Sequence, residues 1–322
     1  MPRHGEVIVI GDANVDIIVH YPSFKNEDRT LVEFRNPVMV GGGTASNTAH
    51  ALGVLGVHCT FVGTVGDDSY GRFALADLAE AGVDVSLLSV RSDLNTVGVF
   101  AFVDERGERY LWGWPRENQS FKVIDESEEL FRRARNAAWV HSSGMSLVYD
   151  TSARSTITRV FKEAYAAGVP TSFDLNLRVD DGVLDPDYSA ALQEILPFVT
   201  HLLGSGPDEY TYLGDGSWKD NARALSNQNR TVIARDGSRG CMAFTDAQCL
   251  ELPAFKVVVE DTVGAGDDYN AGYIYAMLSG HSLAEALQYG NAVSGFAVAH
   301  KGARTTPNTR ELEEFIKTHS SL

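Results

Sequence analysis

The sequence contains few cysteines, fewer basic than acidic residues, and no long apolar run. Its three cysteines, at positions 59, 241 and 249, are too scattered for a disulfide framework or a Cys-x-x-Cys metal site. There are 27 Lys and Arg residues against 43 Asp and Glu, a net charge of −16, and phosphate backbones need clustered cations. No run approaches the roughly 18 apolar residues of a membrane span, and no secretory signal opens the chain. We therefore expect a cytoplasmic protein without nucleic-acid or membrane partners.

Several common enzyme motifs are also missing. The sequence has no Gly-x-x-x-x-Gly-Lys and no Gly-x-Gly-x-x-Gly, which disfavours a Walker-type loop and a dinucleotide-binding fingerprint. It has no Gly-x-Ser-x-Gly either, which disfavours an esterase of the α/β-hydrolase kind. The nine histidines show no spacing typical of metal ligands.

Predicted strands alternate with predicted helices along most of the chain. The β-branched run Val7–Ile10 indicates a buried strand, and apolar residues at helical spacing follow at 48–55 and 70–81. Further strands are predicted at 138–141, 171–174, 199–203 and 231–234, and helices at 152–167, at 188–196 and after Pro207. This alternation predicts an α/β fold, with a mostly parallel sheet covered by helices on both faces.

Two stretches, 31–40 and 96–114, have strand patterns without an intervening helix. They predict a small β-layer, either an extension of the main sheet or a lid over a ligand cleft. Trp112 and Trp114 lie in the second stretch, where they suit a sugar site or a hydrophobic core.

The segment 261–272, Asp-Thr-Val-Gly-Ala-Gly-Asp-Asp-Tyr-Asn-Ala-Gly, is the most informative. Gly264, Ala265 and Gly266 immediately precede a helical pattern, so their amides would point outward at a helix N-terminus. Such amides suit a phosphate or a phosphoryl group in transfer. Asp267 beside them can accept the proton of an attacking hydroxyl. The alternative is an ordinary helix start with closely packed glycines.

Three weaker candidates follow other predicted strands or open a helix. Gly42, Gly43 and Asn47 combine close backbone approach with an amide that binds hydroxyls, or they form a turn and a helix cap. Asp16 can accept hydrogen bonds from two sugar hydroxyls, or it belongs to a polar loop. Arg178 suits a phosphate or a carboxylate, or a surface ion pair.

Two segments resemble the two signatures of the ribokinase-like carbohydrate kinases, also called the minor-phosphofructokinase family. The first runs from Gly42 and Gly43 through Asn47 to Gly56 and Gly66, and the second is 261–272. The resemblance implies a three-layer α/β/α fold with a mostly parallel sheet. It implies a single kinase domain over 1–322, with lid strands inserted at about 12–40 and 96–116. It also implies ATP-dependent phosphorylation of a hydroxyl on a small pentose or hexose.

The resemblance also assigns roles to individual residues. Asp267 becomes the base, and the backbone of Gly264–Asp267 becomes the anion hole. The sugar is held by Asp16, Gly42, Gly43 and Asn47, and the nucleotide by Glu209, Arg235, Gly237, Gly240 and Asn291. Glu209 helps to arrange Mg²⁺ indirectly, and a monovalent cation such as K⁺ binds backbone near Asp261 and Val263. We also expect a homodimer formed through the lid strands.

Three positions depart from the family pattern. Gly206 replaces the Asn of an Asn-x-x-Glu motif, Arg235 replaces a Thr that contacts phosphate, and Asp268 replaces a small residue. The first two are the only support for a non-catalytic nucleotide- or sugar-binding regulator. Arg116 and Arg178 are placed to face a carboxylate, which favours a sugar acid of the 2-keto-3-deoxygluconate type. A nucleoside is the third alternative for the acceptor.

Overall fold

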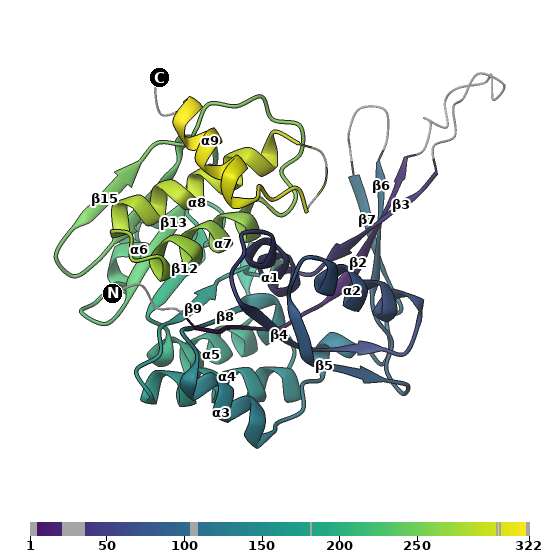
Figure 1. Ribbon diagram of the computed structural model, residues 1–322. Coiled ribbons are helices and arrows are strands. Elements are labelled where there is room, and N and C mark those ends of the chain that lie inside the picture. The colour runs from purple at the N-terminus through teal and green to yellow at the C-terminus, as the bar shows by residue number, and fades with distance from the viewer. Residues whose placement is uncertain are drawn as a thin grey trace.

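The computed structural model describes residues 5–20, 36–103, 109–180, 182–300, 302 and 304–319. Within them a large sheet of nine strands has the order β15-β14-β13-β12-β9-β8-β1-β4-β5, and it is parallel except at β14 and β15 (Figure 1). Its strands are β1 (Val7–Ile10), β4 (Cys59–Gly66), β5 (Asp84–Arg91), β8 (Trp139–Ser143), β9 (Thr171–Asp174), β12 (His201–Ser205), β13 (Thr231–Arg235), β14 (Cys241–Phe244) and β15 (Cys249–Leu252).

Helices cover both faces of this sheet. They are α1 (Thr44–Val54), α2 (Ser69–Glu80), α3 (Glu128–Asn136), α4 (Ser152–Ala166), α5 (Pro186–Ile195), α6 (Trp218–Leu225), α7 (Ala265–Leu278), α8 (Leu283–Val298) and α9 (Thr309–His319). Single 3₁₀ turns lie at η2 (Ser120–Lys122), η3 (Gly144–Leu147), η4 (Leu196–Phe198), η5 (Tyr210–Tyr212) and η6 (Gly237–Arg239). No described helix is long and apolar enough to cross a bilayer.

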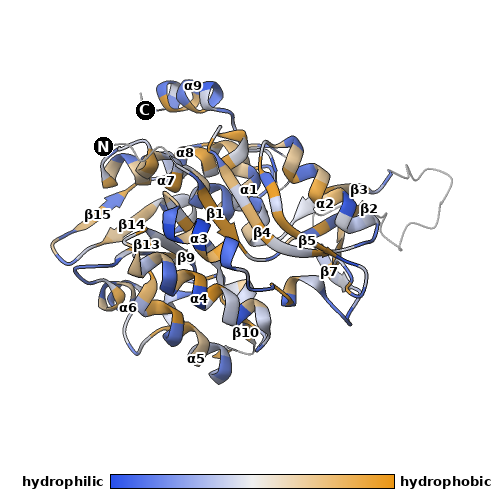
Figure 2. Cartoon of the chain, turned by 60° about the horizontal axis from the view of Figure 1, so that its bottom comes forward, coloured by the Kyte–Doolittle hydropathy of each residue, from blue (hydrophilic) through white to orange (hydrophobic). Residues whose placement is uncertain are grey.

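The side chains of β1 point alternately into two hydrophobic cores. Val7 and Val9 join the core formed with α1, α2, α7, α8 and α9, whereas Ile8 and Ile10 join the core formed with α3, α4, α5 and α6. Because both faces are covered, β1 is apolar along its whole length, as parallel strands usually are. Figure 2 shows β1 in orange and the outer helix α3 largely in blue. The expected α/β architecture with a mostly parallel sheet is confirmed.

A second, four-stranded sheet stands at one side of the molecule, with the order β3-β2-β6-β7 (Figure 1). Its strands are β2 (Asn14–His20), β3 (Val38–Gly42), β6 (Gly98–Val103) and β7 (Arg109–Trp114). A two-residue pair, β10 (Val179–Asp180) and β11 (Val183–Leu184), lies apart from both sheets. Of the predicted strand 31–40, residues 31–35 lie outside the described residues. The polar run that holds Asp16 continues into β2.

The helix expected after Pro207 is present, but it does not begin in the segment that immediately follows the proline. This segment contains only the 3₁₀ turn η5, and α6 begins eleven residues after the proline. Gly214 and Gly216 interrupt the helical pattern between them, because glycine loses the most backbone freedom in a helix. A capping box of Ser217 and Asp220 then starts α6.

Candidate active site

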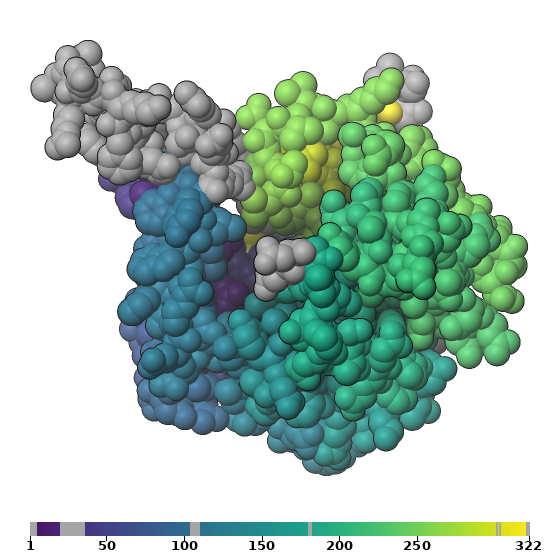
Figure 3. Space-filling model, turned by 180° about the vertical axis from the view of Figure 1, so that it is seen from behind, coloured from purple at the N-terminus to yellow at the C-terminus, as the bar shows by residue number. Residues whose placement is uncertain are grey.

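A cavity of about 620 Å³ lies where the carboxyl ends of the central parallel strands meet the small sheet and the start of α7. Figure 3 shows the hollow between the blue N-terminal part and the green C-terminal part of the chain. The predicted site residues that line it are Asp16, Gly43, Asn47, Arg178, Glu209, Arg235, Val263, Gly264, Ala265, Gly266 and Asp267. Segments more than 200 residues apart therefore share one site.

Six predicted site residues do not line this cavity, namely Gly42, Arg116, Gly237, Gly240, Asp261 and Asn291. Gly42 still borders it, because a Cβ at Gly42 would lie 2.7 Å from the Asp16 carboxyl carbon. Arg116 is exposed just after the edge strand β7, so its expected contact with the acceptor is not supported. Trp112 and Trp114 are 40% and 52% exposed and contact each other instead of the cavity.

The N-terminus of α1 is capped by a residue from another segment. Gly43 precedes the helix with φ +98°, a conformation that favours glycine, and it supplies no side chain. The carboxylate of Asp12 accepts hydrogen bonds from the amides of Thr44 (3.0 Å) and Ala45 (3.1 Å). This cap joins the end of β1 to the start of α1. The sequence did not indicate it, because cap and helix are 32 residues apart.

The N-terminus of α7 is left open. Gly264 precedes the helix in the left-handed conformation (φ +77°) and no side chain caps it. Among the described residues, no acceptor is bonded to the amides of Gly266 and Asp267. Free amides at a helix start, together with the helix dipole, form an anion site. Unlike α1, whose first amides are bonded to Asp12, α7 therefore has free amides in its first turn that an anion could bind.

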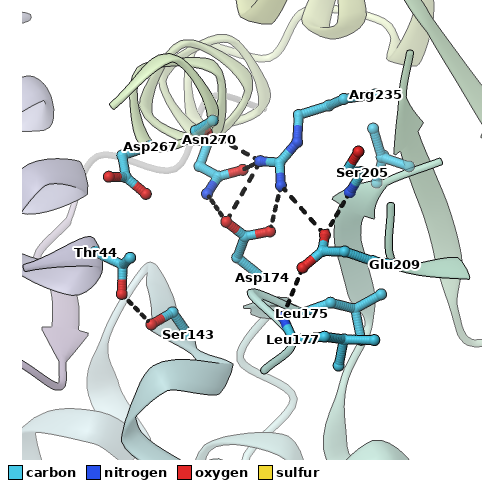
Figure 4. A network of polar contacts seen from close by, with 12 residues as sticks. Thr44, Ser143, Asp174, Leu175, Leu177, Ser205, Glu209, Arg235, Asp267 and Asn270 are labelled. Atoms are coloured by element: carbon cyan, nitrogen blue, oxygen red, sulfur yellow. Dashed lines mark hydrogen bonds and ion pairs between the residues drawn. The ribbon is translucent and has the colours of Figure 1, made fainter. Parts of the chain in front are cut away.

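Asp267 is buried in the first turn of α7 and faces the cavity (Figure 4). Its Oδ2 accepts a hydrogen bond from Nδ2 of Asn47 at 2.9 Å. Burial raises the pKa of Asp267 well above that of an ordinary aspartate, and the carboxylates of Asp174, Asp268 and Asp12 add to this, while the Asn47 bond opposes it. A carboxylate with a raised pKa is a better proton acceptor near neutral pH.

Arg235 points inward beneath the start of α7 (Figure 4). Its guanidinium forms an ion pair with Asp174 at 2.6 Å and donates to Oδ1 of Asn270 at 2.8 Å and to the carbonyl of Gly266 at 3.0 Å. Nδ2 of Asn270 in turn donates to Asp174 at 2.9 Å. Where the family has a threonine hydroxyl, this chain therefore has a buried ion pair that supports the open end of α7.

Glu209 connects two loops at the bottom of the cavity. Its oxygens accept hydrogen bonds from the amides of Leu177 (2.6 Å) and Ser205 (2.5 Å), and Arg235 lies 4.0 Å away. Burial raises the pKa of Glu209, whereas the two amides and the cation oppose that rise. Its oxygens are thus already engaged by the protein.

The departure at Gly206 has a local steric reason. A Cβ at this position would lie 2.8 Å from the ring of Trp218, closer than real Cβ atoms approach. An asparagine cannot fit there unless the ring moves. Asp268 is also explained, because it is buried rather than solvent-exposed and accepts a hydrogen bond from Thr306 at 2.6 Å.

The residues expected to hold the nucleotide lie beyond Arg235. Gly237 (φ +55°) begins the turn after β13, and a Cβ there would meet open space. Gly240 (φ +104°) packs against the backbone of Leu252 and 253–254, so its role is structural at least in part. Asn291 of α8 is buried and donates to the carbonyl of Pro253 at 3.1 Å.

On the opposite side, the cavity holds polar atoms without partners. Asn14 and Asn176 both line it, and each has a buried side-chain oxygen that no described donor reaches. Burial raises the pKa of the nearby Asp16 to about 6. Asn176 also has φ +37°, a strained conformation that residues at functional sites often adopt. Both asparagines follow predicted strands, a signal that was available in the sequence but too common to single them out.

Comparison with known proteins agrees with this geometry. The pfkB family of carbohydrate kinases matches residues 5–310, so the chain belongs to this family of ATP-dependent sugar kinases. It is 31% identical to the ATP-dependent ribose-1-phosphate kinase of Halopiger xanaduensis, over 96% of this chain and 97% of the relative. It is 30% identical to the aminoimidazole riboside kinase of Salmonella typhimurium, over 99% and 98% of the two chains.

Solved structures share the fold along nearly the whole chain. The fructokinase of Xylella fastidiosa with bound ATP superimposes with a TM-score of 0.83 at 23% identity, covering 99% of this chain and 100% of the other. The aminoimidazole riboside kinase of Salmonella enterica, complexed with aminoimidazole riboside and an ATP analogue, gives a TM-score of 0.78 at 25% identity. It covers 97% of this chain and 99% of the other. The ribokinase-like fold is therefore confirmed, and the enzyme is a phosphotransferase that acts on sugar hydroxyls.

Proposed function

We propose that Asp267 removes the proton of the acceptor hydroxyl while the first amides of α7 bind the phosphoryl group of ATP in transfer. The observation that carries this proposal is the buried carboxylate of Asp267 next to two unbonded amides in one cavity. The hydroxyl oxygen attacks the γ-phosphorus, its proton passes to Asp267, and ADP leaves. Charge that develops on the phosphoryl oxygens is stabilised by the amides and the helix dipole.

The test is ADP release with ATP and Mg²⁺ against pentoses, hexoses, sugar acids and nucleosides. Asp267→Asn is expected to lower kcat by about 10²–10⁴-fold, the usual contribution of a general base. Asp67→Asn is the matched control, because it makes the same change at an exposed aspartate outside the cavity lining. Near wild-type turnover in Asp267→Asn would refute the assignment. Nucleotide binding without acceptor-dependent ADP release would instead favour the regulator.

The acceptor we favour is a neutral polyhydroxy compound such as a pentose or hexose. The unpartnered oxygens of Asn14 and Asn176, with the carboxylate of Asp16, offer acceptors for several hydroxyl hydrogens. Gly43 and Asn47 border the same space. A sugar with adjacent hydroxyls matches these hydrogen-bond acceptors.

One observation favours an acceptor that also carries a negative charge. Arg178 lines the cavity, and among the described residues it has no carboxylate partner, only a contact to the sulfur of Met145 at 3.4 Å. A sugar phosphate or sugar acid would supply that partner, and a relative at 31% identity is a ribose-1-phosphate kinase. Comparing ribose with ribose 1-phosphate and an aldonate, in wild type and Arg178→Ala, separates the two: only a charged acceptor loses its advantage in the variant.

The nucleotide is expected along the surface formed by Gly237, Gly240 and Asn291, next to Arg235. Among the described residues, no three His, Cys, Asp or Glu side chains form a metal cluster. Mg²⁺ that enters with ATP would need only one or two carboxylates from the protein, and Asp208 and Glu209, which line the cavity, would hold it. When bound, this ion neutralises phosphate charge. Glu209 would act through water, because amides occupy its oxygens.

The remaining roles concern K⁺, the small sheet and the assembly. Asp261 accepts hydrogen bonds from the amides of Val263 (3.0 Å) and Gly302 (3.3 Å), an arrangement that orders backbone for a monovalent cation.

The small sheet, which contributes Asp16 and Val99 to the cavity, would act as the lid of a single kinase domain. Its exposed apolar side chains, among them Leu111 at 63%, support a homodimer through the lid strands, to be tested by light scattering on Leu111→Lys. A cytoplasmic location stays a prediction.

A further inference from the structure

An arginine that the sequence did not single out lies behind the acceptor side of the cavity. Arg304 belongs to the segment between α8 and α9, and its side chain is only 7% exposed. It forms an ion pair with Asp77 of α2 and donates to Oγ of Ser46 at 2.9 Å. A Cβ at Gly41 would overlap its guanidinium, so the glycine leaves room for it.

The third contact of Arg304 reaches a residue that touches the proposed base. Its Nε donates to Oδ1 of Asn47 at 3.2 Å, and Nδ2 of Asn47 donates to Asp267 at 2.9 Å. A guanidinium has only donors, so the oxygen end of the amide must face Arg304. The NH₂ end is thereby directed to Asp267. The reversed amide would place NH₂ against the guanidinium and oxygen against the carboxylate, losing both bonds.

We propose that Arg304 is a positioning residue for phosphoryl transfer, which holds the Asn47 amide in the orientation that donates a hydrogen bond to Asp267. The inference rests on the proposed role of Asp267 as the base. Anchored to Asp77, Arg304 keeps one carboxylate oxygen of Asp267 occupied by Asn47. The other oxygen is then left to accept the proton of the acceptor hydroxyl. The bond also favours the ionised form of Asp267, which is the form that can accept a proton.

Several other charged groups face Asp267. They are Asp174 at the end of β9, Asp12 after β1, the neighbouring Asp268 and Arg235 of β13. Asp16 senses the charge of Arg304, which opposes the rise of its pKa. Arg304→Lys retains the positive charge toward Asp16 and Asp77 but removes the Nε–H that Asn47 accepts. It therefore isolates the orientation of Asn47 from the electrostatic effect of the cation.

The experiment is a double-mutant cycle read out by the pH dependence of kcat/KM, with wild type, Arg304→Lys, Asn47→Ala and the double variant. Losing the hydrogen bond raises the pKa of Asp267, so the acid limb should move up by about one pH unit in each single variant. The double variant should move no further, because both changes remove one bond. Arg310→Lys, an exposed arginine on α9, is the matched control and should leave the limb in place.

Shifts that add in the double variant, or a lower Tm with an unmoved limb, would overturn the proposal. If Arg304→Lys does not fold, Arg304→Met with Asp77→Asn removes both charges and enters the same cycle. A crystal structure of the variant gives a readout that needs no turnover. An Asn47 side chain displaced from Asp267 supports the positioning role, and an unchanged bond refutes it even if Asp267 proves not to be the base.

Discussion

Two buried arginines flank Asp267, and they differ in what they hold. Arg235 pairs with Asp174, whose side chain is 2% exposed, and supports the backbone at the start of α7. Arg304 pairs with Asp77, which is 23% exposed, and fixes a side chain that contacts Asp267. The first therefore belongs to the anion site and the second to the acceptor side. Two arginines of the same kind therefore act differently: Arg235 supports the backbone of Gly266, whereas Arg304 orients the side chain of Asn47.

The comparison predicts the largest loss of stability on the Arg235 side. Arg235→Met leaves the carboxylate of Asp174 buried without its cation, which should lower the free energy of unfolding by about 3–5 kcal/mol. Urea unfolding followed by circular dichroism measures this loss. Arg72→Met removes the cation of an ion pair with Asp67 in which both side chains are more than half exposed, so it should change little. Equal effects of the two variants would show that Asp174 does not depend on Arg235.

Asp268 is a buried aspartate on α7 that forms no ion pair with any arginine in the described part of the chain, so removing its charge should stabilise the protein. Burial raises its pKa to about 7, and its Oδ2 has no described partner. Because the folded pKa exceeds the unfolded one, this residue contributes stability below about pH 4, and that contribution is lost as the pH rises through 7. Asp268→Asn should therefore gain up to about 4 kcal/mol above pH 7 and little in acid. The test is the free energy of unfolding measured from pH 4 to pH 8, with the exposed Asp67→Asn as control. A stability change in Asp268→Asn that does not depend on pH would contradict the prediction.

On the Arg304 side the loss should be smaller. Asp77→Asn weakens a pair that water partly reaches, so we expect a decrease of about 1–3 kcal/mol in the free energy of unfolding. The acid limb of kcat/KM should stay close to that of wild type, because the amide oxygen that the variant keeps at position 77 still accepts a hydrogen bond from Arg304 and holds it against Asn47. The decrease is measured by the same urea titration as for Arg235→Met. A loss larger than that of Arg235→Met would reverse the ranking of the two sides.

The smallest effect is expected at Gly206, whose amide donates to the backbone carbonyl of Arg235 at 2.6 Å but where an added Cβ would meet the ring of Trp218 and not a guanidinium. Gly206→Ala places a methyl group against the ring of Trp218, which is half-buried, at a cost of about 1 kcal/mol. Gly113→Ala, where the added Cβ would make an ordinary contact at 3.7 Å, is the control for thermal unfolding. If both variants unfold at the same temperature, the ring of Trp218 does not explain why this position lacks the family asparagine.

The local elements were readable from the sequence where each pattern is self-contained. Val7–Ile10 and Thr171–Asp174 form strands with the predicted bounds. The open start of α7 was also readable, because Gly264 and Gly266 leave no capping side chain. The family resemblance added the architecture. The helix predicted after Pro207 is present as α6, but its start was not readable, because Gly214 and Gly216 delay it.

The sequence by itself determined the alternation of strands and helices, the family, and the position of Asp267 directly after the glycine-rich turn. These properties depend on hydrophobic period, turn residues and motifs, all of which lie within short stretches. Only the tertiary structure decided that Arg304 reaches Asn47 across 257 positions and that Asp12 caps α1. It also decided that Arg235 turns inward and that Arg116 lies outside the cavity. Ion pairs and hydrogen bonds between distant segments depend on how the chain returns to the same place, and local spacing carries no record of that.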